Sequence, residues 1–548
     1  MASAAEHHEH GRSSMARIII ASSAGTAFEW YDFFIFGSLT PIISKVFFTG
    51  LDPTAALVAA LALFAVGFAF RPLGAILFGA MGDRIGRKAT FLATVSLMGG
   101  ATFAIGLLPT YASAGIAAPI LLIILRICQG TALGGEYGGA AIYVAEHAPD
   151  DRRGATTGWI QSSASFGLLA ALLVIFVTRR LLGEEAFAEW GWRIPFLVSV
   201  VLLAISVWMR AKLSESPAFE KLREEGEVSK APLKEAFADR TNLKRVAIAF
   251  FAIMCAQGAV WYFTFFYMQV FLEKSLGIPG ATKDLLLIIM TVASAPLYVL
   301  FGRLSDRVGR KPVMLAGMLL ALVLYFPGSH WIAEAANPAL VAAQQATPVV
   351  VHADPATCTA QFDPTGTRRF DSGCDVAKSL LVARGISYRT VDASGATTIT
   401  VGASSLAVPD LHDAAPDRFA AAKTDIGKQL GAQLSAAGYP SAADPARMNW
   451  PVLVGVLLLF VVASTALYGP QAAALVEMFP TRIRYSALSL PYHFGTGWVG
   501  GFLPFTSFAI VAITGDIYAG LWYAVIFTAI SVLTTVFFLK ETAGKSID

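Results

Sequence analysis

The chain has 548 residues, of which 55% are hydrophobic and only 14% are charged, whereas a soluble globular protein carries about 25% charged residues. A lipid bilayer is therefore its natural solvent. The net charge is only +3, and the basic residues stand in short clusters between apolar runs. This excludes the long basic face that nucleic-acid binding requires, so we expect no nucleic-acid partner.

Apolar runs of about 20 residues, the length that crosses a bilayer as a helix, form two sets of six. The first set lies near 17–44, 54–80, 89–109, 116–145, 155–182 and 191–211. The second lies near 246–272, 282–302, 312–333, 450–476, 485–513 and 519–539. The first run lacks a small-residue cleavage site and contains two acidic residues, so we expect a first spanning helix and not a signal peptide. The pattern predicts an all-α polytopic protein with two six-helix bundles.

An internal repeat supports two similar halves. Gly79-x-x-x-Asp83-Arg84-x-Gly86-Arg87-Lys88 recurs, 223 residues later, as Gly302-x-x-x-Asp306-Arg307-x-Gly309-Arg310-Lys311. Glu146-x-x-Pro149-x-x-x-Arg153 recurs, 331 residues later, as Glu477-x-x-Pro480-x-x-x-Arg484. The two offsets differ by 108 residues, so the second half contains an insertion of roughly that length.

The insertion falls at 334–449, where the apolar pattern lapses. A predicted helix near 416–437 and alternating runs near 387–401 indicate a small α+β domain. Cys358 and Cys374 lie close together in this segment, so a disulfide between them is expected if the compartment is oxidising.

The positions of Lys and Arg predict the orientation, because short basic loops face the cytoplasm. The two copies of the Asp-Arg motif form such loops. This predicts that both termini are cytoplasmic and that 334–449 is periplasmic. The expected division is a tail, 1–16; a first bundle, 17–211; a cytoplasmic loop, 212–245; helices seven to nine, 246–333; the insertion, 334–449; and the last three helices with a short tail, 450–548.

Repeated polar loops are typical of two bundles that meet on one side of the membrane and separate again, because such contacts are breakable. We therefore predict a gate formed by both motif pairs; the alternative is that they are simply positive-inside loops. The predicted gating residues are Gly79, Asp83, Arg84, Gly86, Arg87, Lys88, Glu146, Arg153, Asp306, Arg307, Gly309, Arg310, Lys311, Glu477 and Arg484.

Ionisable residues inside spans cost about 2.5–3.5 kcal/mol each on insertion scales and so indicate function. Glu29 and Asp32 are three residues apart and share a helix face, and Arg126 is the partner that we expect. A carboxylate beside a buried arginine alternates between an ionised, paired form and a protonated, released form, as proton coupling requires. We predict proton coupling by Asp32, Arg126, Glu29 and Glu136; the alternative is a static pair that orients helices.

Arg71 lacks an obvious local acid, so we expect it to bind a substrate carboxylate. The alternatives are that it reaches the interface or pairs with Glu136. The other predicted substrate-binding residues are Tyr137, Gln161, Gln257, Trp261, Tyr262, Tyr492 and His493. Aromatic residues at such positions also serve packing, and a lone histidine is often a satisfied core residue.

The loop at 79–88 resembles the signature loop of the major facilitator superfamily. Four further segments resemble its metabolite:proton symporter family, namely Glu29-Trp-Tyr-Asp-Phe33, Phe70-Arg-Pro-Leu-Gly74, Gly134-Gly-Glu-Tyr-Gly-Gly-Ala140 and Trp192-Arg-Ile-Pro-Phe196. Arg126-x-x-Gln129-Gly130 is similar to the fourth-span motif of proton-coupled members. The resemblance covers the chain except the first fifteen residues and the insertion. It implies the major facilitator fold and transport of citrate, α-ketoglutarate, shikimate, other carboxylates, or proline and betaine.

Together these features predict a monomeric transporter of the cell inner membrane that takes up a small carboxylate-bearing metabolite with protons, by alternating access. We expect no enzyme activity, cofactor or metal site. One alternative is a proline or betaine osmolyte symporter, although no long charged heptad tail follows the last span. Another is a nutrient sensor that uses the insertion.

Overall fold

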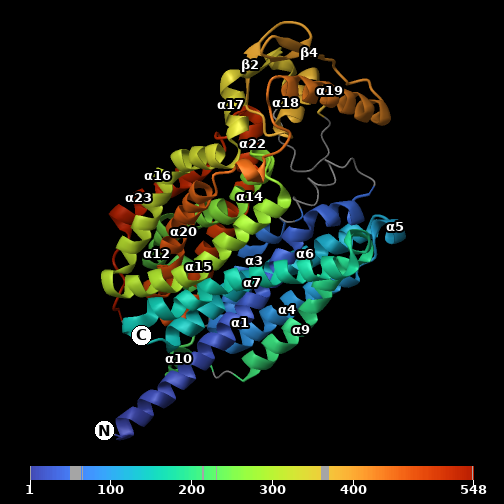
Figure 1. The fold of residues 1–548 in the computed structure, drawn as a ribbon. Helices are drawn as coiled ribbons and strands as arrows, with labels where there is room; N and C mark the ends of the chain where they lie inside the picture. Colours follow the sequence, from blue (N-terminus) through green and yellow to red (C-terminus); the bar gives the residue numbers. More distant parts are fainter. Residues whose placement is uncertain are drawn as a thin grey trace.

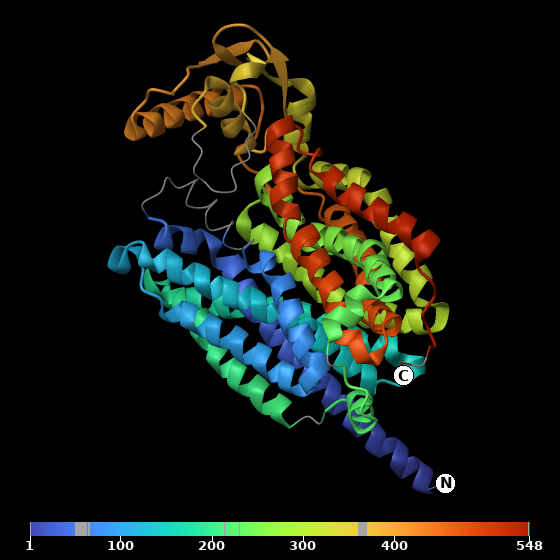
Figure 2. The ribbon, with the colours of Figure 1, turned by 180° about the vertical axis from the view of Figure 1, so that it is seen from behind.

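The computed structural model describes residues 2–49, 63, 66–212, 215–229, 231–359, 370–545 and 547. The long helices form two groups, one from each half of the chain, and the inserted segment stands at one end of the molecule (Figure 1). Both chain termini lie at the opposite end, which we call the terminal end. Seen from behind, the inserted segment rises from the group formed by the second half and extends over the group formed by the first half (Figure 2).

The first group contains the long helices of the amino-terminal half. They are α1 (Ala2–Phe47), α3 (Arg71–Ile85), α4 (Arg87–Leu107), α6 (Ala117–His147), α7 (Arg153–Leu182) and α9 (Arg193–Ala211). Shorter helical segments connect them: α5 (Tyr111–Ala114), η1 (Asp150–Arg152), α8 (Glu184–Ala186) and η2 (Phe187–Gly191). In hydrocarbon every backbone polar group needs an internal partner, which a helix provides. The expected tail at 1–16 instead continues the first helix, because α1 begins at Ala2.

Two short helices, α10 (Pro217–Glu224) and α11 (Pro232–Ala238), link the groups. The second group begins with a continuous run of α12 (Arg240–Ile248), η3 (Ala249–Met254), α13 (Cys255–Tyr262), η4 (Phe263–Tyr267), α14 (Met268–Val270) and η5 (Phe271–Ser275), in which the η segments are π-helical. It continues with α15 (Gly280–Val308), α16 (Arg310–Ala336), α20 (Trp450–Met478), α21 (Arg484–His493), η9 (Phe494–Gly500), α22 (Leu503–Thr514) and α23 (Leu521–Phe538). Such π turns are frequent at functional sites.

Ten helical runs of the described residues are long and apolar enough to cross a membrane. They correspond to the third to twelfth predicted spans. The first predicted span, 17–44, lies within α1, and the second, 54–80, runs partly outside the described residues. The predicted run at 485–513 is not one α-helix, because η9 and a break separate α21 from α22.

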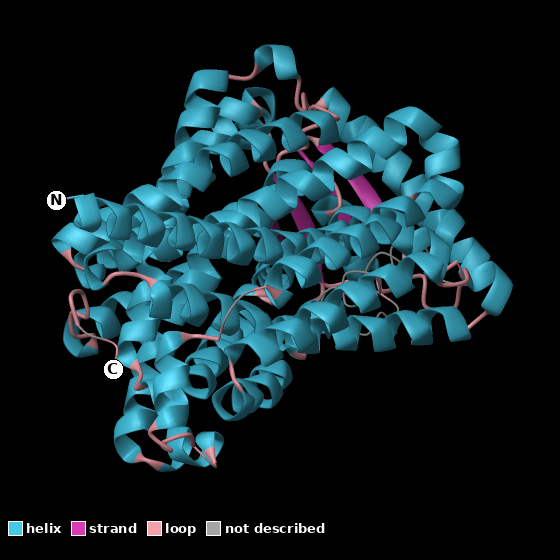
Figure 3. Cartoon of the chain, turned by 90° about the horizontal axis from the view of Figure 1, so that it is seen from below, coloured by secondary structure: helices cyan, strands magenta, loops and turns pink. Residues whose placement is uncertain are grey.

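The four strands of the described residues all lie in the inserted segment. In the view from below, strands are visible behind the helices (Figure 3). They are β1 (Val349–Ala353), β2 (Tyr388–Asp392), β3 (Thr397–Val401) and β4 (Ser404–Val408), in the order β2-β1-β3-β4. β1 pairs parallel with β2 and antiparallel with β3, which pairs antiparallel with β4. The segment also contains α17 (Pro338–Ala346), η6 (Pro355–Thr357), α18 (Gly373–Val382), α19 (Pro416–Ala436) and η7 (Pro445–Arg447). The expected α+β insertion is confirmed, although β1, β4 and α18 were not predicted.

Backbone hydrogen bonds attach the inserted segment to turns of the second group. The N–H of Tyr388 donates to the carbonyl of Gly515 at 2.8 Å, and the N–H of Ala443 donates to that of Gly277 at 2.9 Å. Gly385 has a positive φ of 66°, and a β-carbon there would approach the carbonyl oxygens of the η5 end at 2.4 and 2.5 Å. The insertion has its own apolar core, separate from the large core of the helix groups.

Candidate functional site

Two aspartates of the repeated motif join the helix groups at the terminal end. Asp83, in α3, accepts hydrogen bonds from the N–H groups of Tyr485 and Ser486, at the start of α21. Asp306, in α15, accepts from the N–H groups of Gly154 and Ala155, at the start of α7, at 2.8 Å each. Each half thus places a carboxylate on the amino terminus of a helix in the other half, where the helix dipole favours negative charge.

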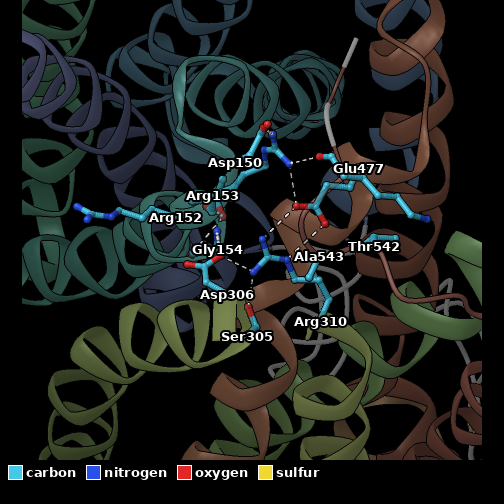
Figure 4. Close-up of polar contacts among 12 residues, drawn as sticks. Asp150, Arg152, Arg153, Gly154, Ser305, Asp306, Arg310, Glu477, Thr542 and Ala543 are labelled. Carbon is cyan, nitrogen blue, oxygen red and sulfur yellow. Dashed lines mark hydrogen bonds and ion pairs between the residues drawn. The ribbon is translucent and has the colours of Figure 1, made fainter. Parts of the chain in front are cut away.

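Two arginine–glutamate clusters surround these aspartates. In one, Arg310 and Arg153 converge on Glu477, with nitrogen–oxygen distances of 3.1 and 3.0 Å (Figure 4). In the other, Arg484 lies 2.7 Å from Glu146, and Arg87 lies 3.8 Å from it. The arginines at 310 and 87 also bind their own aspartates, at 2.5 and 3.1 Å.

The glutamates in these clusters are fully buried. Removing one partner of such a buried ion pair leaves an uncompensated charge, so the clusters strongly favour the joined state of this end.

We call the contact of Asp306 with the start of α7 and that of Asp83 with the start of α21 the two gates. Glycines allow the helices to cross closely at the first of them. A β-carbon on Gly154 would lie 2.4 Å from the carbonyl oxygen of Gly302, and one on Gly302 would lie 2.3 Å from that of Gly154. At the matching position of the other crossing stands Tyr485, whose ring packs on Gly82 and whose hydroxyl donates to the carbonyl of Gly135. Gly79 faces the backbone of Ser486 there. The two gates are thus alike in charge but different in packing.

The other motif residues hold the connecting turns. Gly86 and Gly309 have φ of 112° and 109°, which L-residues rarely adopt. Arg84 and Arg307 are exposed, and the side chains of Lys88 and Lys311 point toward the surface of the same turns as half-buried groups.

Two glutamates that were not predicted cap the helices after these turns. Glu215 accepts from the N–H groups of Arg87 and Lys88, and Glu541 from those of Arg310 and Lys311. Partial burial raises the pKa of Glu541, but hydrogen bonds from four backbone N–H groups outweigh it and hold the pKa below its ordinary value of 4.5. A third repeat, Leu213-x-Glu215-Ser216 and Leu539-x-Glu541-Thr542, is the sequence signal that would have found them.

Arg71, at the start of α3, lies in the centre of the molecule. Its Nη1 donates to the hydroxyl of Tyr262 in the other helix group at 3.2 Å. The guanidinium carbon lies 4.3 Å from the ring centre of Phe68 and 4.8 Å from that of Phe33. Its Nε and Nη2 are buried and have no hydrogen-bond partner among the described residues. These two nitrogens form the side of a guanidinium that binds a carboxylate bidentately.

Four aromatic rings form a box beside Arg71. Trp30 and Phe34 come from α1, Trp261 from α13 and Phe266 from η4, and neighbouring ring centres are 5.4 to 5.9 Å apart. The indole N–H of Trp261 donates to Tyr298 at 2.8 Å. The space that Phe34, Trp261 and Phe266 help to line is only about 10 Å³, about the volume of one water molecule. In this conformation the rings close on one another.

Two of the remaining predicted substrate residues, Gln161 and Tyr492, contact Tyr468, whose ring lies 6.1 Å from that of Trp261. Gln161 donates to the carbonyl of Tyr468 at 3.1 Å, and the hydroxyls of Tyr468 and Tyr492 are 3.2 Å apart. Both ring nitrogens of His493 are buried without a hydrogen-bond partner in the described part of the chain, as is the Oε1 of Gln257. The side chains of Tyr137 and Glu136 lie outside the described part, so the predicted roles of these two residues stay predictions.

The expected direct ion pair between Asp32 and Arg126 is not what the structure contains. The carboxylate of Asp32 lies close to the hydroxyl of Thr102, and that hydroxyl donates to the carbonyl of Met98. The amide nitrogen of Gln129 donates to the same hydroxyl, and its amide oxygen accepts from Arg126, both at 2.8 Å. Thr102 and Gln129 thus lie between Asp32 and Arg126. The sequence motif contained Gln129, but Thr102 has no signal of its own.

Glu29 pairs with a different arginine. Its carboxylate lies 2.8 Å from Nη1 of Arg210 in α9, and both side chains are buried. The guanidinium of Arg210 also lies 3.6 Å from the ring centre of Phe91. A β-carbon on Gly25 would collide with that guanidinium at 2.4 Å, so the glycine makes room for the pair. Glu29 and Asp32 therefore do not share one arginine, although they lie on one helix face.

The comparison with known families decides the class of the protein. The model of the Major Facilitator Superfamily matches residues 23–326 and 249–346. The chain belongs to the Major Facilitator Superfamily. It is a multi-pass membrane protein of this superfamily, as the sequence predicted.

Among its relatives, the proline/betaine transporter of Escherichia coli K12 is 36% identical over 322 residues, which are 57% of this chain and 64% of that protein. The chain thus matches less than two thirds of that transporter's length. The inner membrane metabolite transport protein YhjE of the same organism is 36% identical over 333 residues, 60% of this chain and 75% of that protein.

The structure of the proton:xylose symporter XylE bound to 6-bromo-6-deoxy-D-glucose is similar in fold, with a TM-score of 0.62 and 17% identity over 98% of each chain.

Proposed function

We propose that this member of the superfamily is a proton-coupled symporter for a small zwitterion of the proline or betaine class, which bears a carboxylate and an alkylated ammonium group. The carboxylate was expected from the sequence, but the organic-acid substrate favoured there is the weaker choice. The named relatives at about 36% identity include proline/betaine transporters. The aromatic box beside Arg71 supports the same choice, because a pure carboxylate has no need of one.

The carboxylate of the solute is assigned to Arg71. Its free Nε and Nη2 offer two parallel N–H donors in a buried site, where charge-assisted hydrogen bonds are strong. Phe33 lies between two guanidinium groups, 4.8 Å from that of Arg71 and 5.5 Å from that of Arg126. Two cations so close together favour the entry of an anion.

The ammonium group is assigned to the box of Trp30, Phe34, Trp261 and Phe266. Aromatic cages recognise quaternary ammonium ions through the negative faces of their rings. Two of the rings come from each helix group. Because the ring centres lie only 5.4 to 5.9 Å apart, a solute must move the rings apart to enter. Binding and rearrangement of the two bundles are thereby linked.

Proton coupling is assigned to Asp32. Its carboxylate is buried, and one oxygen has no hydrogen-bond partner among the described residues. Ionised Asp32 attracts the positive charge of Arg126 across Thr102 and Gln129, whereas the protonated form does not. The guanidinium groups of Arg126 and Arg71 both lie against the ring of Phe33. A change in the charge of Asp32 that moves Arg126 therefore changes the positive charge beside the proposed carboxylate site. Glu29 and Arg210 serve better as a fixed pair within the first bundle.

The orientation follows the basic loops. The terminal end carries the Asp-Arg motifs and is assigned to the cytoplasm, and the inserted segment to the opposite side of an inner membrane. The monomer contains every residue of the site.

The test is uptake by proteoliposomes that contain the purified full chain. Glycine betaine or proline, supplied with an inward proton gradient, should accumulate above the outside concentration, and a protonophore should abolish the accumulation. Citrate and α-ketoglutarate serve as the comparison. Accumulation of these and not of the zwitterions would contradict the proposed substrate class, and accumulation unaffected by the protonophore would contradict the coupling.

A further inference from the structure

The disulfide of the inserted segment lies at the carboxyl end of an inner strand, a place where functional sites form in α/β sheets. β1, α18 and β2 form a parallel β-α-β unit, and β1 is an inner strand of the sheet, between β2 and β3. α19 lies beside α18, because Arg384 donates to the carbonyl of Gly427 at 2.7 Å. The connection from β1 to α18 therefore leaves the carboxyl end of an inner strand, where the order of strands changes direction. Sites in α/β sheets form at this place.

Cys358 and Cys374 are bonded across that connection. Cys358 follows β1, whereas Cys374 is the second residue of α18, a helix of 10 residues. The two sulfurs differ in access: Cys374 is fully buried, and Cys358 is partly exposed. A thiolate that approaches from solvent therefore meets Cys358 first.

The surroundings of Cys374 suit a leaving thiolate. It stands at the amino terminus of α18, where backbone N–H groups and the helix dipole stabilise negative charge. Lys378 lies one turn further along the same helix face and is mostly buried. The negative charge of Asp375 acts in the opposite direction, but its two oxygens accept hydrogen bonds from the N–H and hydroxyl of Thr359 at 2.9 and 2.6 Å.

Hydrogen bonds hold the ends of the intervening loop together without the disulfide. Besides the Thr359–Asp375 contacts, the hydroxyl of Ser372 donates to the carbonyl of Thr357 at 2.7 Å. The apolar core around α18 and the sheet is continuous on either side of the cysteines. The disulfide is thus one of several contacts that join the two ends of this loop.

We propose that the Cys358–Cys374 pair is a thiol–disulfide exchange site for a dithiol on the side of the membrane where the insertion lies. A thiolate of the dithiol attacks Sγ of Cys358 and forms a mixed disulfide, the Cys358–Cys374 bond breaks, and its electron pair leaves with Cys374 as a thiolate. The second thiol of the dithiol then displaces Cys358. The dithiol is oxidised to a disulfide, and the pair gains two electrons and two protons. This goes beyond the transport function and does not depend on it.

The first experiment measures native reduction in the purified full chain. The free thiols at Cys128 and Cys255 are first blocked with N-ethylmaleimide under native conditions. Dithiothreitol is then added, and the thiols that appear are alkylated and located by peptide mapping. We expect Cys358 and Cys374 to be released about tenfold faster than oxidised glutathione is reduced in the same buffer. Release no faster than that, or release only at temperatures at which the protein unfolds, would overturn the proposal.

The second experiment locates the first attack. Reduced glutathione replaces dithiothreitol, the reaction is quenched with acid, and the adduct is mapped. It should lie on Cys358, with Cys374 free; an adduct that lies mainly on Cys374 would overturn the assigned direction. Lys378→Met should slow the release two- to threefold by removing the nearby cation. The matched control, Lys423→Met on α19, should leave the rate unchanged.

Discussion

Asp306 of α15 accepts a hydrogen bond from the backbone N–H of Gly154 in α7 at 2.8 Å, and this contact joins the two bundles at the terminal end. Its counterpart, Asp83, binds the start of α21 on the other side of the same interface. If the bundles move as rigid units, both contacts must open together.

Gly154→Ala should open this end. The new β-carbon would lie 2.4 Å from the carbonyl oxygen of Gly302, and overpacking of this kind costs about 1–3 kcal/mol. Hydrogen–deuterium exchange of peptides covering 153–158 and 484–488 should become at least about fivefold faster, since both gates open. Gly100→Ala, in α4 with no atom within 4 Å, is the control. Faster exchange at 153–158 alone would contradict rigid movement.

Arg71→Lys should weaken binding of the zwitterion, because lysine cannot form two parallel hydrogen bonds to one carboxylate. We expect a rise in Kd of at least about tenfold, which corresponds to the loss of one charge-assisted hydrogen bond. Titration calorimetry with glycine betaine measures it. Arg240→Lys, at an exposed position of α12, should leave Kd unchanged. A Kd equal to that of the unmodified protein would remove Arg71 from the site.

Asp32→Asn should abolish accumulation against a gradient and retain exchange of external for internal solute. The amide resembles the protonated acid and cannot ionise, so the return of the proton is lost while solute binding remains. Uptake and counterflow in the same proteoliposomes separate the two activities. Asp284→Asn, an exposed position at the start of α15, is the control. Undiminished accumulation by the Asp32 variant would assign coupling elsewhere.

Arg210→Met should destabilise the protein by about 3–5 kcal/mol, because it leaves the carboxylate of Glu29 buried and uncompensated. The double variant, Glu29→Gln with Arg210→Met, should recover most of that loss, since no charge is then buried. Thermal unfolding in detergent compares the three proteins. If the double variant is stable and still accumulates solute with protons, the pair is structural; a double variant without proton-driven accumulation would place Glu29 in the coupling path.

Glu541→Gln should lower Tm by roughly 1–2 °C at neutral pH, the effect of one carboxylate on a helix amino terminus. Because the folded-state pKa of Glu541 is depressed, its stabilisation is present above the ordinary pKa of 4.5 and is lost as pH falls through the folded value. The Tm difference from the unmodified protein should therefore be constant between pH 8 and 6, decline below pH 4.5 and vanish only below the folded-state pKa. Glu189→Gln, an exposed position of η2, should show no such pH-dependent difference.

The residues of the gate were predictable because they occur twice. A repeat at a fixed offset marks Asp83 with Asp306, and Glu146 with Glu477, before any contact is known. The third pair, Glu215 and Glu541, repeats with a shorter match and was missed. The interior was harder to predict, because Thr102, Arg210 and Phe266 have no counterpart in the internal repeat. They also lie on helices whose rotation about their axes the sequence does not specify.

The sequence by itself determined the membrane class, the two halves, the place of the insertion and the charged residues that must find partners, since apolar length and repetition are local properties of the chain. Only the tertiary structure decided which partner each buried charge has. Glu29 pairs with Arg210, Arg126 donates to Gln129 and not to Asp32, and Arg71 donates to Tyr262. The physical reason is that each pairing depends on how neighbouring helices pack and on their rotation about their axes. Many residues far apart in the chain set that packing together, so no local stretch of sequence specifies it.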